Sequence, residues 1–519
     1  MQIVNKKDSF SNKSIAKSAG VIAIATMASR ILGYVRDMII ARLFGTGSPA
    51  QAFFQAFRIP NLLRDIVGEG ATNAAFIPVF AEYLTKKDKK EFWELANVLM
   101  NLMLVILAGI SIVGILISPM IVRLIAPGFV SDPEKFHLTI KLTRVMFPYI
   151  LLVGLTAYGS GILNSLKYFS IPAIGPCLFN IFLILSALLL CQKYKIGAMG
   201  LAIGVLLGGV VQLILQIPVL LKKGMDLRPC LRLYHPAARR IGLLLIPRGI
   251  GSCVYQLNVF ISSALASFGS IVGEGGVAAL YYANRIFQLP MAVFGISIAT
   301  AALPQMSIHA VRNDMEKLKS TLLFSLRAVL FITIPASIGL MVLGREITQV
   351  LFERGAFNSY STGITSSALF YYSIGLFAFT GVNLLVPVFY SLQDTMTPVK
   401  TAAFALIINV VLSLLLMNPL KVGGLALAAS ISSMVNFSML FMLLRKRIGN
   451  LGGMKLLDSF VRILLSSLIM GAACLILSQN KIAGLAVSIP AGIAAFLFAS
   501  FIFRVRETKE LLLWLLKKR

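Results

Sequence analysis

Residues 168–221 read YFSIPAIGPCLFNIFLILSALLLCQKYKIGAMGLAIGVLLGGVVQLILQIPVLL. Two runs without Asp, Glu, Lys or Arg, residues 168–192 and 196–221, flank a short turn that contains two lysines. A helix needs about 20 predominantly apolar residues to cross a hydrocarbon core that is about 30 Å thick. Each run meets this requirement, so the stretch predicts two membrane-spanning helices joined by a tight turn.

The same pattern recurs along the whole chain. Runs without charged residues cover 95–122, 145–166, 168–192, 196–221, 249–273, 286–308, 328–344, 355–393, 401–420, 422–444, 463–480 and 482–503. Two more apolar segments, about 18–43 and 49–83, carry charges inside them. If the long run 355–393 crosses once, the chain has about 14 transmembrane helices. The predicted fold class is therefore an all-α polytopic membrane protein.

Composition agrees with a membrane protein. The chain has 519 residues, of which 58% are hydrophobic and only 13% are charged, against about 25% charged residues in soluble domains. Lys and Arg number 48 and Asp and Glu number 20, so the formal net charge is +28. A disordered chain is excluded by this hydrophobic content.

The basic residues gather in every second predicted loop, which the positive-inside rule assigns to the cytoplasm. The loops carry Lys86, Lys87, Lys89 and Lys90, then Lys222, Lys223, Arg228, Arg232, Arg239 and Arg240, then Arg312, Lys317 and Lys319, then Arg445, Lys446 and Arg447. An even number of spans places both termini in the cytoplasm. Basic residues that bind nucleic acid cluster on one face or arm, so this alternation predicts no nucleic-acid partner.

The sequence shows no cluster of residues that is typical of a catalytic or metal-binding site. The three histidines are scattered, and the five cysteines are unclustered and mostly inside apolar runs, where they are expected to act as small core residues. No Gly-rich phosphate loop, metal-ligand spacing or nucleophile–base arrangement stands out. We predict that the protein is not an enzyme and holds no cofactor.

Two parts of the sequence are similar to each other and indicate an internal duplication. Pro172, Asn180 and the turn at Lys195 are followed by an apolar run with glycines, and Pro398, Asn409 and Lys421 repeat that order. This duplication predicts an N-lobe (1–225), a C-lobe (226–450), two additional helices (451–503) and a basic cytoplasmic tail (504–519). Transporters built from duplicated halves place their substrate site at the interface of the halves.

Charged residues inside the predicted spans are the candidates for function. They are Arg30, Arg36, Asp37, Arg42, Arg58, Arg64, Asp65, Glu69 and Arg285. One Arg at the centre of a membrane helix costs about 2.5–3.5 kcal/mol, so these side chains are expected to face protein or a water-filled cavity. Six arginines against three acids leave a positive surplus, which suits a phosphate or pyrophosphate because the planar guanidinium binds such oxygens bidentately.

Helical geometry sorts the charges of the second span. At about 100° per residue, Arg58, Asn61, Asp65 and Glu69 share one face, whereas Arg64 lies off it. Arg58 with Asp65 or Glu69 forms either part of a ligand site or a purely structural ion pair. Arg36, Arg64 and Arg285 are the stronger candidates for contact with an anion.

Several sequence motifs accompany these charges. They are Ser29-Arg30-Ile31-Leu32-Gly33-Tyr34-Val35-Arg36-Asp37, Pro60-Asn61-Leu62-Leu63-Arg64, Glu69-Gly70, Ala126-Pro127-Gly128-Phe129, Tyr281-Tyr282-Ala283-Asn284-Arg285 and Phe389-Tyr390-Ser391-Leu392-Gln393-Asp394 with Thr397-Pro398. Together they resemble the MurJ/MviN family of bacterial lipid II flippases. The motifs run from about residue 20 to residue 430.

The resemblance implies a member of the multidrug/oligosaccharidyl-lipid/polysaccharide exporter superfamily, with two six-helix pseudo-symmetric lobes around a central cavity and two extra C-terminal helices that form a groove for the lipid tail. It implies alternating access that moves undecaprenyl-pyrophosphoryl-disaccharide-pentapeptide from the cytoplasmic to the outer leaflet of the bacterial inner membrane, for peptidoglycan synthesis. Substrate-binding residues would be Arg30, Arg36, Arg64 and Arg285. Supporting cavity charges and amides would be Asp37, Arg58, Asn61, Asp65 and Glu69.

The implied partners are lipid II, membrane lipids and other cell-wall synthesis proteins, with the chain itself a monomer. The sequence departs from many relatives at Gln51, Asp65 and Gln288, where an acid, an arginine and an acid are common. Some relatives bind sodium through an Asn-x₃-Asp pair, which is Asn409 with Ser413 here. We therefore expect no metal requirement and a driving force from the membrane potential or another ion gradient. A polysaccharide-lipid flippase and a drug/cation antiporter of the same superfamily are the alternatives.

Overall fold

The structure is a computed structural model that describes residues 4–64, 76–86, 88–225, 236, 240–241, 256–478 and 481–509. These residues form helices and short turns, and no strand occurs among them. Apolar segments become helical because a helix satisfies its own backbone hydrogen bonds, which a segment in lipid cannot satisfy with water. The all-α polytopic fold class is confirmed.

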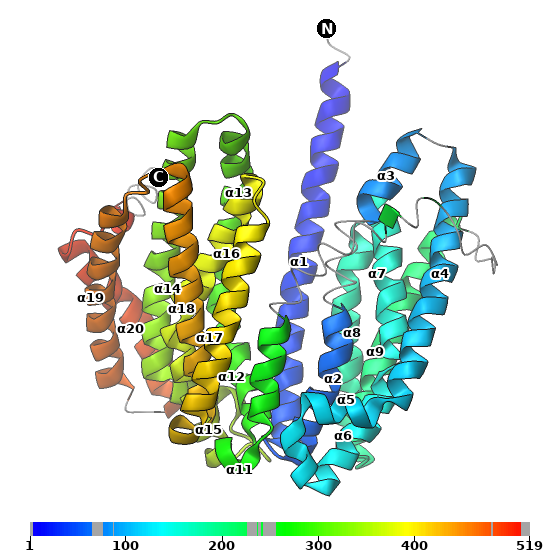
Figure 1. The fold of residues 1–519 in the computed structure, drawn as a ribbon, viewed down its shortest axis with the longest axis horizontal. Helices are drawn as coiled ribbons and strands as arrows, with labels where there is room; N and C mark the ends of the chain where they lie inside the picture. The colour runs from blue at the N-terminus through cyan, green and yellow to red at the C-terminus, as the bar shows by residue number, and fades with distance from the viewer. Residues whose placement is uncertain are drawn as a thin grey trace. The chain divides into compact units, whose positions relative to one another are not determined.

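The chain forms two compact units, an N-terminal unit (Met1–Gln256) and a C-terminal unit (Leu257–Arg519). The N-terminal unit contains α1 (Val4–Phe44), α2 (Ser48–Arg64), α3 (Ile77–Lys86), α4 (Lys89–Leu116), α5 (Ser118–Ile125), α6 (Pro133–Met146), α7 (Tyr149–Ser165), α8 (Ser170–Ser186) and α9 (Ala198–Lys222). A 3-10 turn (Pro127–Ser131) precedes α6, and a π-helical segment, η3 (Ala187–Lys193), extends α8. In this unit α1 packs along α8, and α8 packs along α9 (Figure 1).

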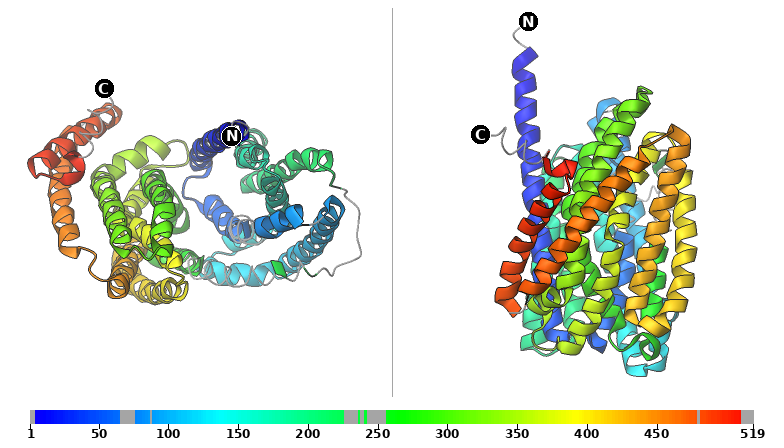
Figure 2. Two further views of the ribbon diagram at one scale, coloured as in Figure 1. Left: turned by 90° about the horizontal axis from the view of Figure 1, so that it is seen from above. Right: turned by 90° about the vertical axis from the view of Figure 1, so that its left-hand side faces the viewer.

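The C-terminal unit begins within the helix Gln256–Ala266, at its second residue, Leu257. It continues with α11 (Gly269–Val272), α12 (Gly276–Pro290), the π-helical η4 (Met291–Gly295), α13 (Ile296–Val311), α14 (Met315–Phe352), α15 (Ser359–Ile374), α16 (Leu376–Ser391), α17 (Met396–Leu420), α18 (Val422–Ile448), α19 (Gly453–Leu477) and α20 (Lys481–Ile502). The last two helices lie at the edge of this unit, packed against α14 (Figure 2). Arg327 on α14 donates to the backbone oxygen of Lys455 and lies 3.9 Å from Glu507.

Ten described helices are long and apolar enough to cross a membrane. An eleventh span is the bent pair α15 and α16, which meet at 50° and coincide with the predicted run 355–393. The remaining predicted spans fall on α1, on α2 with α3, and on the short apolar helix Gln256–Ala266. The count of fourteen remains a prediction with which these helices are consistent.

The bend between α15 and α16 is stabilised by a neighbouring helix. Gly375 separates the two helices, and a Cβ at this position would lie 2.8 Å from the Ser430 Cα on α18. The Ser430 hydroxyl donates to the backbone oxygens of Tyr371 at 2.7 Å and Tyr372 at 3.2 Å. A break in a membrane helix frees carbonyl groups that need new partners, and Ser430 supplies one.

The two echoing sequence segments form similar helix pairs, α8–α9 and α17–α18. Each pair is joined by a tight turn that contains a lysine with positive φ, Lys195 (φ 55°) and Lys421 (φ 51°). A glycine follows each turn where the helices approach closely. A Cβ at Gly200 would lie 2.7 Å from the Cys191 Sγ, and one at Gly424 would lie 2.1 Å from the Leu416 backbone oxygen.

Candidate functional site

The charged residues of the first predicted span lie on α1. This helix continues without interruption through Arg30, Arg36 and Asp37, so a membrane helix carries three charges within eight positions. Asp37 is completely buried, and the Arg36 side chain is 13% exposed. Arg30, by contrast, is exposed, and among the described residues it makes no hydrogen bond or ion pair.

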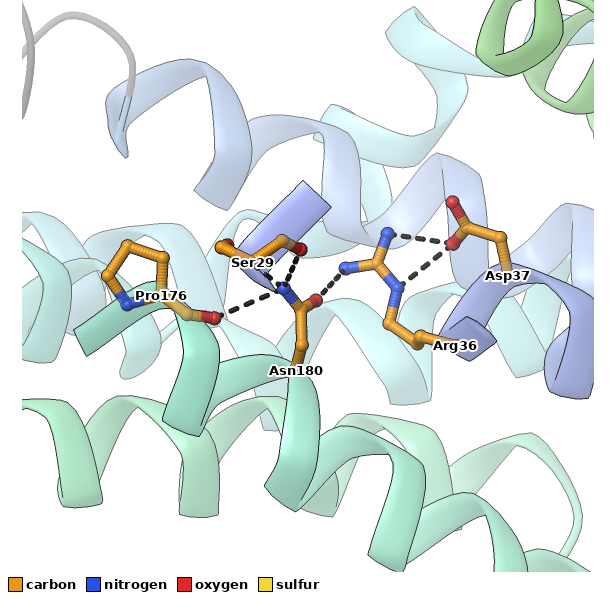
Figure 3. Close-up of polar contacts among 5 residues, drawn as sticks. All are labelled: Ser29, Arg36, Asp37, Pro176 and Asn180. Atoms are coloured by element: carbon orange, nitrogen blue, oxygen red, sulfur yellow. Dashed lines mark hydrogen bonds and ion pairs between the residues drawn. The ribbon is translucent and has the colours of Figure 1, made fainter. Parts of the chain in front are cut away.

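Arg36 and Asp37 form a close ion pair. The Nε of Arg36 donates to the Asp37 Oδ1 at 2.9 Å, and its Nη2 donates to the same oxygen at 2.7 Å (Figure 3). Hydrogen bonds between ionised groups are roughly twice as strong as neutral ones. The pair balances one positive charge of α1 with a negative one, so the positive surplus expected at the site depends on the other arginines.

Asn180 on α8 contacts the other edge of the same guanidinium. Its Oδ1 accepts from the Arg36 Nη1 at 3.0 Å, and its Nδ2 donates to the backbone oxygens of Ser29 and Pro176, both at 3.1 Å (Figure 3). Asn180 is 7% exposed. The duplicated sequence pattern includes Asn180 but does not predict this contact. An amide inside an otherwise apolar run is the signal that could have indicated it.

The second cluster of candidates lies on α2. Arg58 and Asn61 are half-buried, and Arg64, at the end of the helix, is exposed. Asp65 and Glu69 lie outside the described residues, and with them the predicted pairing of Arg58 with these carboxylates. Gln51, one of the departures from relatives, is buried near the start of α2.

Arg285 belongs to the C-terminal unit. It lies half-buried on α12, one turn from Gln288 and beside the buried Ile286. The tyrosines of the same motif are packed by aromatic rings, since the Tyr282 ring centroid lies 5.1 Å from that of Phe352 and 5.5 Å from that of Phe357. This packing holds the middle of α12, about one turn before Arg285.

The candidate sodium position is a cluster of neutral side chains. Asn409 on α17 donates through Nδ2 to Asn258 and, at 3.4 Å, to the Ser262 hydroxyl, while the Ser413 hydroxyl donates to the Asn409 Oδ1 at 3.1 Å. No carboxylate belongs to this set. Across the described part of the chain, no group of three or more His, Cys, Asp or Glu residues could hold a metal ion.

The described helices define a polytopic helical membrane protein with a charged pair inside α1. A MATE family transporter of the MOP superfamily in an inward-facing conformation has the same fold, with a TM-score of 0.69 over 84% of this chain and 98% of that chain, at 19% sequence identity. A structure described as lipid II flippase MurJ in an inward closed conformation is more similar, with a TM-score of 0.79, 28% identity, and coverage of 93% of this chain and 98% of that one.

Sequence comparison narrows the class to one family. Residues 40–494 match the family model described as lipid II flippase MurJ. A probable lipid II flippase MurJ from Rhizobium tropici is 36% identical over 472 residues, which cover 90% of this chain and 88% of the relative. The lipid II flippase MurJ from Burkholderia cenocepacia is 34% identical over 426 residues, covering 81% and 82%. The chain belongs to the MurJ family of lipid II flippases.

Proposed function

We propose that this protein moves lipid II, undecaprenyl pyrophosphate carrying the disaccharide-pentapeptide, from the cytoplasmic to the outer leaflet of the bacterial cytoplasmic membrane, where it supplies peptidoglycan synthesis. The observation that carries the proposal is the family match over residues 40–494. The charged residues of α1 support it, because a buried guanidinium in a membrane helix suits an anionic head group.

In this proposal Arg30, Arg36, Arg64 and Arg285 contact the pyrophosphate. The Arg36 guanidinium has a fixed direction, because it donates hydrogen bonds to Asp37 from one edge and to Asn180 from another. Arg30 supplies charge from an exposed position on the same helix. Asp37, Arg58, Asn61, Asp65 and Glu69 adjust the charge around the anion. The protein performs transport and no covalent chemistry.

The polyprenyl tail would stay in lipid beside the last two helices. α19 and α20 expose large apolar side chains along their length, including Leu465, Ile476 and Phe498. A lobe formed by residues 1–225 and another formed by 226–450 would alternate between inward and outward openings, with 451–503 as the groove for the tail. We further propose that the chain acts as a monomer, with both termini cytoplasmic.

The membrane potential can drive the return of the empty carrier. An empty site with excess guanidinium carries positive charge, and an inside-negative potential attracts it to the cytoplasmic side with about 2.3 kcal/mol per charge per 100 mV. Lipid II would neutralise that charge on the outward step. The neutral cluster around Asn409 and Ser413 supports a cycle without sodium.

The test is rescue of a bacterial strain depleted of its own lipid II flippase. The wild-type chain should restore growth and bring lipid II to the outer face, measured by cleavage with an externally added lipid II-degrading enzyme. Arg36→Ala, Arg64→Ala and Arg285→Ala should each fail at wild-type expression levels. Lys86→Ala, which removes a 71% exposed charge, is the matched control and should rescue. Rescue by all three arginine variants, or none by the wild type, would overturn the proposal.

A further inference from the structure

We infer that Asn180 is a positioning residue, which fixes the direction of the Arg36 guanidinium toward the anionic head group. The inference deepens the proposed function and rests on it for the identity of the anion. The contact itself, between the Asn180 Oδ1 and the Arg36 Nη1 at 3.0 Å, joins residues that are 144 positions apart in the chain.

Two partners on different helices determine where the guanidinium points. Asp37 on α1 takes the edge formed by Nε and Nη2, and Asn180 on α8 takes Nη1. An arginine side chain has many rotamers, and its planar fork recognises an anion only in a defined plane. One acceptor leaves the guanidinium able to swing about that contact, whereas acceptors on two edges fix the plane.

The orientation of the Asn180 amide follows from its other contacts. The Nδ2 group lies 3.1 Å from the backbone oxygens of Ser29 and Pro176. Carbonyl oxygens only accept hydrogen bonds, so the amide nitrogen must face them and the amide oxygen must face Arg36. The same side chain therefore ties α8 to α1 and presents an acceptor to the arginine.

The C-terminal unit contains a similar asparagine without an arginine. Asn180 bonds to Ser29 and Asn409 bonds to Asn258, and both pairs are 151 residues apart. The residue 144 positions before Asn409 is Leu265. An asparagine thus joins a corresponding pair of helices in each unit, but only Asn180 also contacts a guanidinium. The contact with Arg36 is therefore separable from the joining of the helices.

Cys177 provides a control on the same two helices. Its Sγ lies 3.2 Å from the backbone oxygen of Ala25, one helical turn before the Asn180 contacts. Cys177→Ala removes a contact between α1 and α8 without touching Arg36. A role for Asn180 that is merely structural would be shared by Cys177, whereas a positioning role would not.

The first experiment measures the direction of Arg36 without any lipid. Purified full-length protein is treated with phenylglyoxal, which modifies arginine, and the modification rate of each site is followed by mass spectrometry of peptides. Asn180→Ala should raise the rate at Arg36 at least about threefold, because a charged hydrogen bond that shields it is lost. The rate at Arg30, which is exposed on the same helix, is the internal reference and should not change. Cys177→Ala should leave both rates at their wild-type values.

The second experiment measures binding of undecaprenyl pyrophosphate to the purified protein. Asn180→Ala should weaken binding roughly tenfold, and Cys177→Ala less than twofold. In an Arg36→Ala background, Asn180→Ala should weaken binding less than twofold further, because coupled residues are not additive. If Asn180→Ala does not fold, Asn180→Leu, which has a similar shape and no hydrogen-bonding group, replaces it and should weaken binding where Arg36 is present and less than twofold in the Arg36→Ala background.

Unchanged labelling of Arg36, or equal losses of binding with and without Arg36, would overturn the inference. A wild-type chain that binds no undecaprenyl pyrophosphate would count against the proposed function. The labelling result would still decide whether Asn180 positions Arg36, so the two failures are distinguishable.

Discussion

Arg36 and Asp37 are consecutive residues of α1, and the Arg36 Nη2 lies 2.7 Å from the Asp37 Oδ1. Consecutive side chains leave a helix about 100° apart and do not face each other. The pair therefore forms because the long arginine side chain can reach the short, buried carboxylate of its neighbour.

We expect Asp37→Asn to destabilise the protein by about 1–3 kcal/mol. Removing one partner of a buried ion pair leaves an uncompensated charge, and the partial exposure of Arg36 reduces the full penalty. Thermal unfolding of the purified protein measures the loss. The double variant Arg36→Gln with Asp37→Asn should recover part of the stability, because it leaves no buried charge. An Asp37→Asn protein as stable as the wild type would contradict this account.

Sodium should not be needed for transport. The oxygen and nitrogen atoms of Asn258, Asn409 and Ser413 bond to one another, and none of these side chains offers the negative charge that favours a cation. Lipid II transport in vesicles should proceed at the same rate in sodium and in potassium buffers. A rate that rises several-fold with sodium alone would contradict this prediction.

Gly424→Ala should destabilise the C-terminal unit by about 1–3 kcal/mol or more. A Cβ there would lie 2.1 Å from the backbone oxygen of Leu416, and overpacking against backbone cannot be relieved by a side-chain rotation. The control is Gly363→Ala on α15, where a Cβ meets nothing within 4 Å. That change should be neutral or stabilising by about 0.5–1 kcal/mol, because alanine favours helix. Equal unfolding temperatures for the two variants would refute the prediction.

Asp394 should contribute to stability in a manner that depends on pH. The backbone N–H of Thr397 and the nearby Arg447 lower the pKa of this carboxyl below its ordinary value. A lowered folded-state pKa gives stability that is present above the ordinary pKa and is lost as the pH falls through the folded pKa. Asp394→Asn should cost about 1 kcal/mol at pH 7.

Unfolding of the wild type and of Asp394→Asn across a pH series measures this effect. The gap between the two unfolding temperatures should close in acid, where Asp394 of the wild type is protonated. Lys86→Ala, which removes an exposed charge at the end of α3, should show no such convergence. A gap that is constant from neutral to acid pH would mean that the charge of Asp394 is irrelevant to folding.

The helices were predictable from sequence because membrane segments must be long, apolar and internally hydrogen-bonded. The charges of α1 were predictable for the opposite reason, since Arg30, Arg36 and Asp37 stand out in an apolar run. Their contacts were not predictable. The position of Asn180 beside Arg36 depends on how α8 packs on α1, and hydrophobic periodicity does not specify that packing.

The Arg36–Asp37 pair was also missed, because helical spacing points to partners three or four residues away. The shared helix face predicted that Arg58 pairs with Asp65 or Glu69, and this remains a prediction. The predicted surplus of arginines over acids already counts Asp37 among the acids, so the Arg36–Asp37 pair leaves it a prediction. The arginine side chain is long enough to reach the adjacent acid, and a helical wheel does not take side-chain length into account.

The long helix α14 packs on the last two helices, α19 and α20, and also on α13, α15 and α16. Its 38 residues span about 57 Å at 1.5 Å per residue, nearly twice the thickness of the hydrocarbon core. α19 and α20 both pack on α14. Arg327 of α14 donates a hydrogen bond to the backbone oxygen of Lys455 and lies near Glu507. A tilt of α14 would therefore carry α19 and α20 with it, and the apolar side chains that these helices expose would change depth in the bilayer.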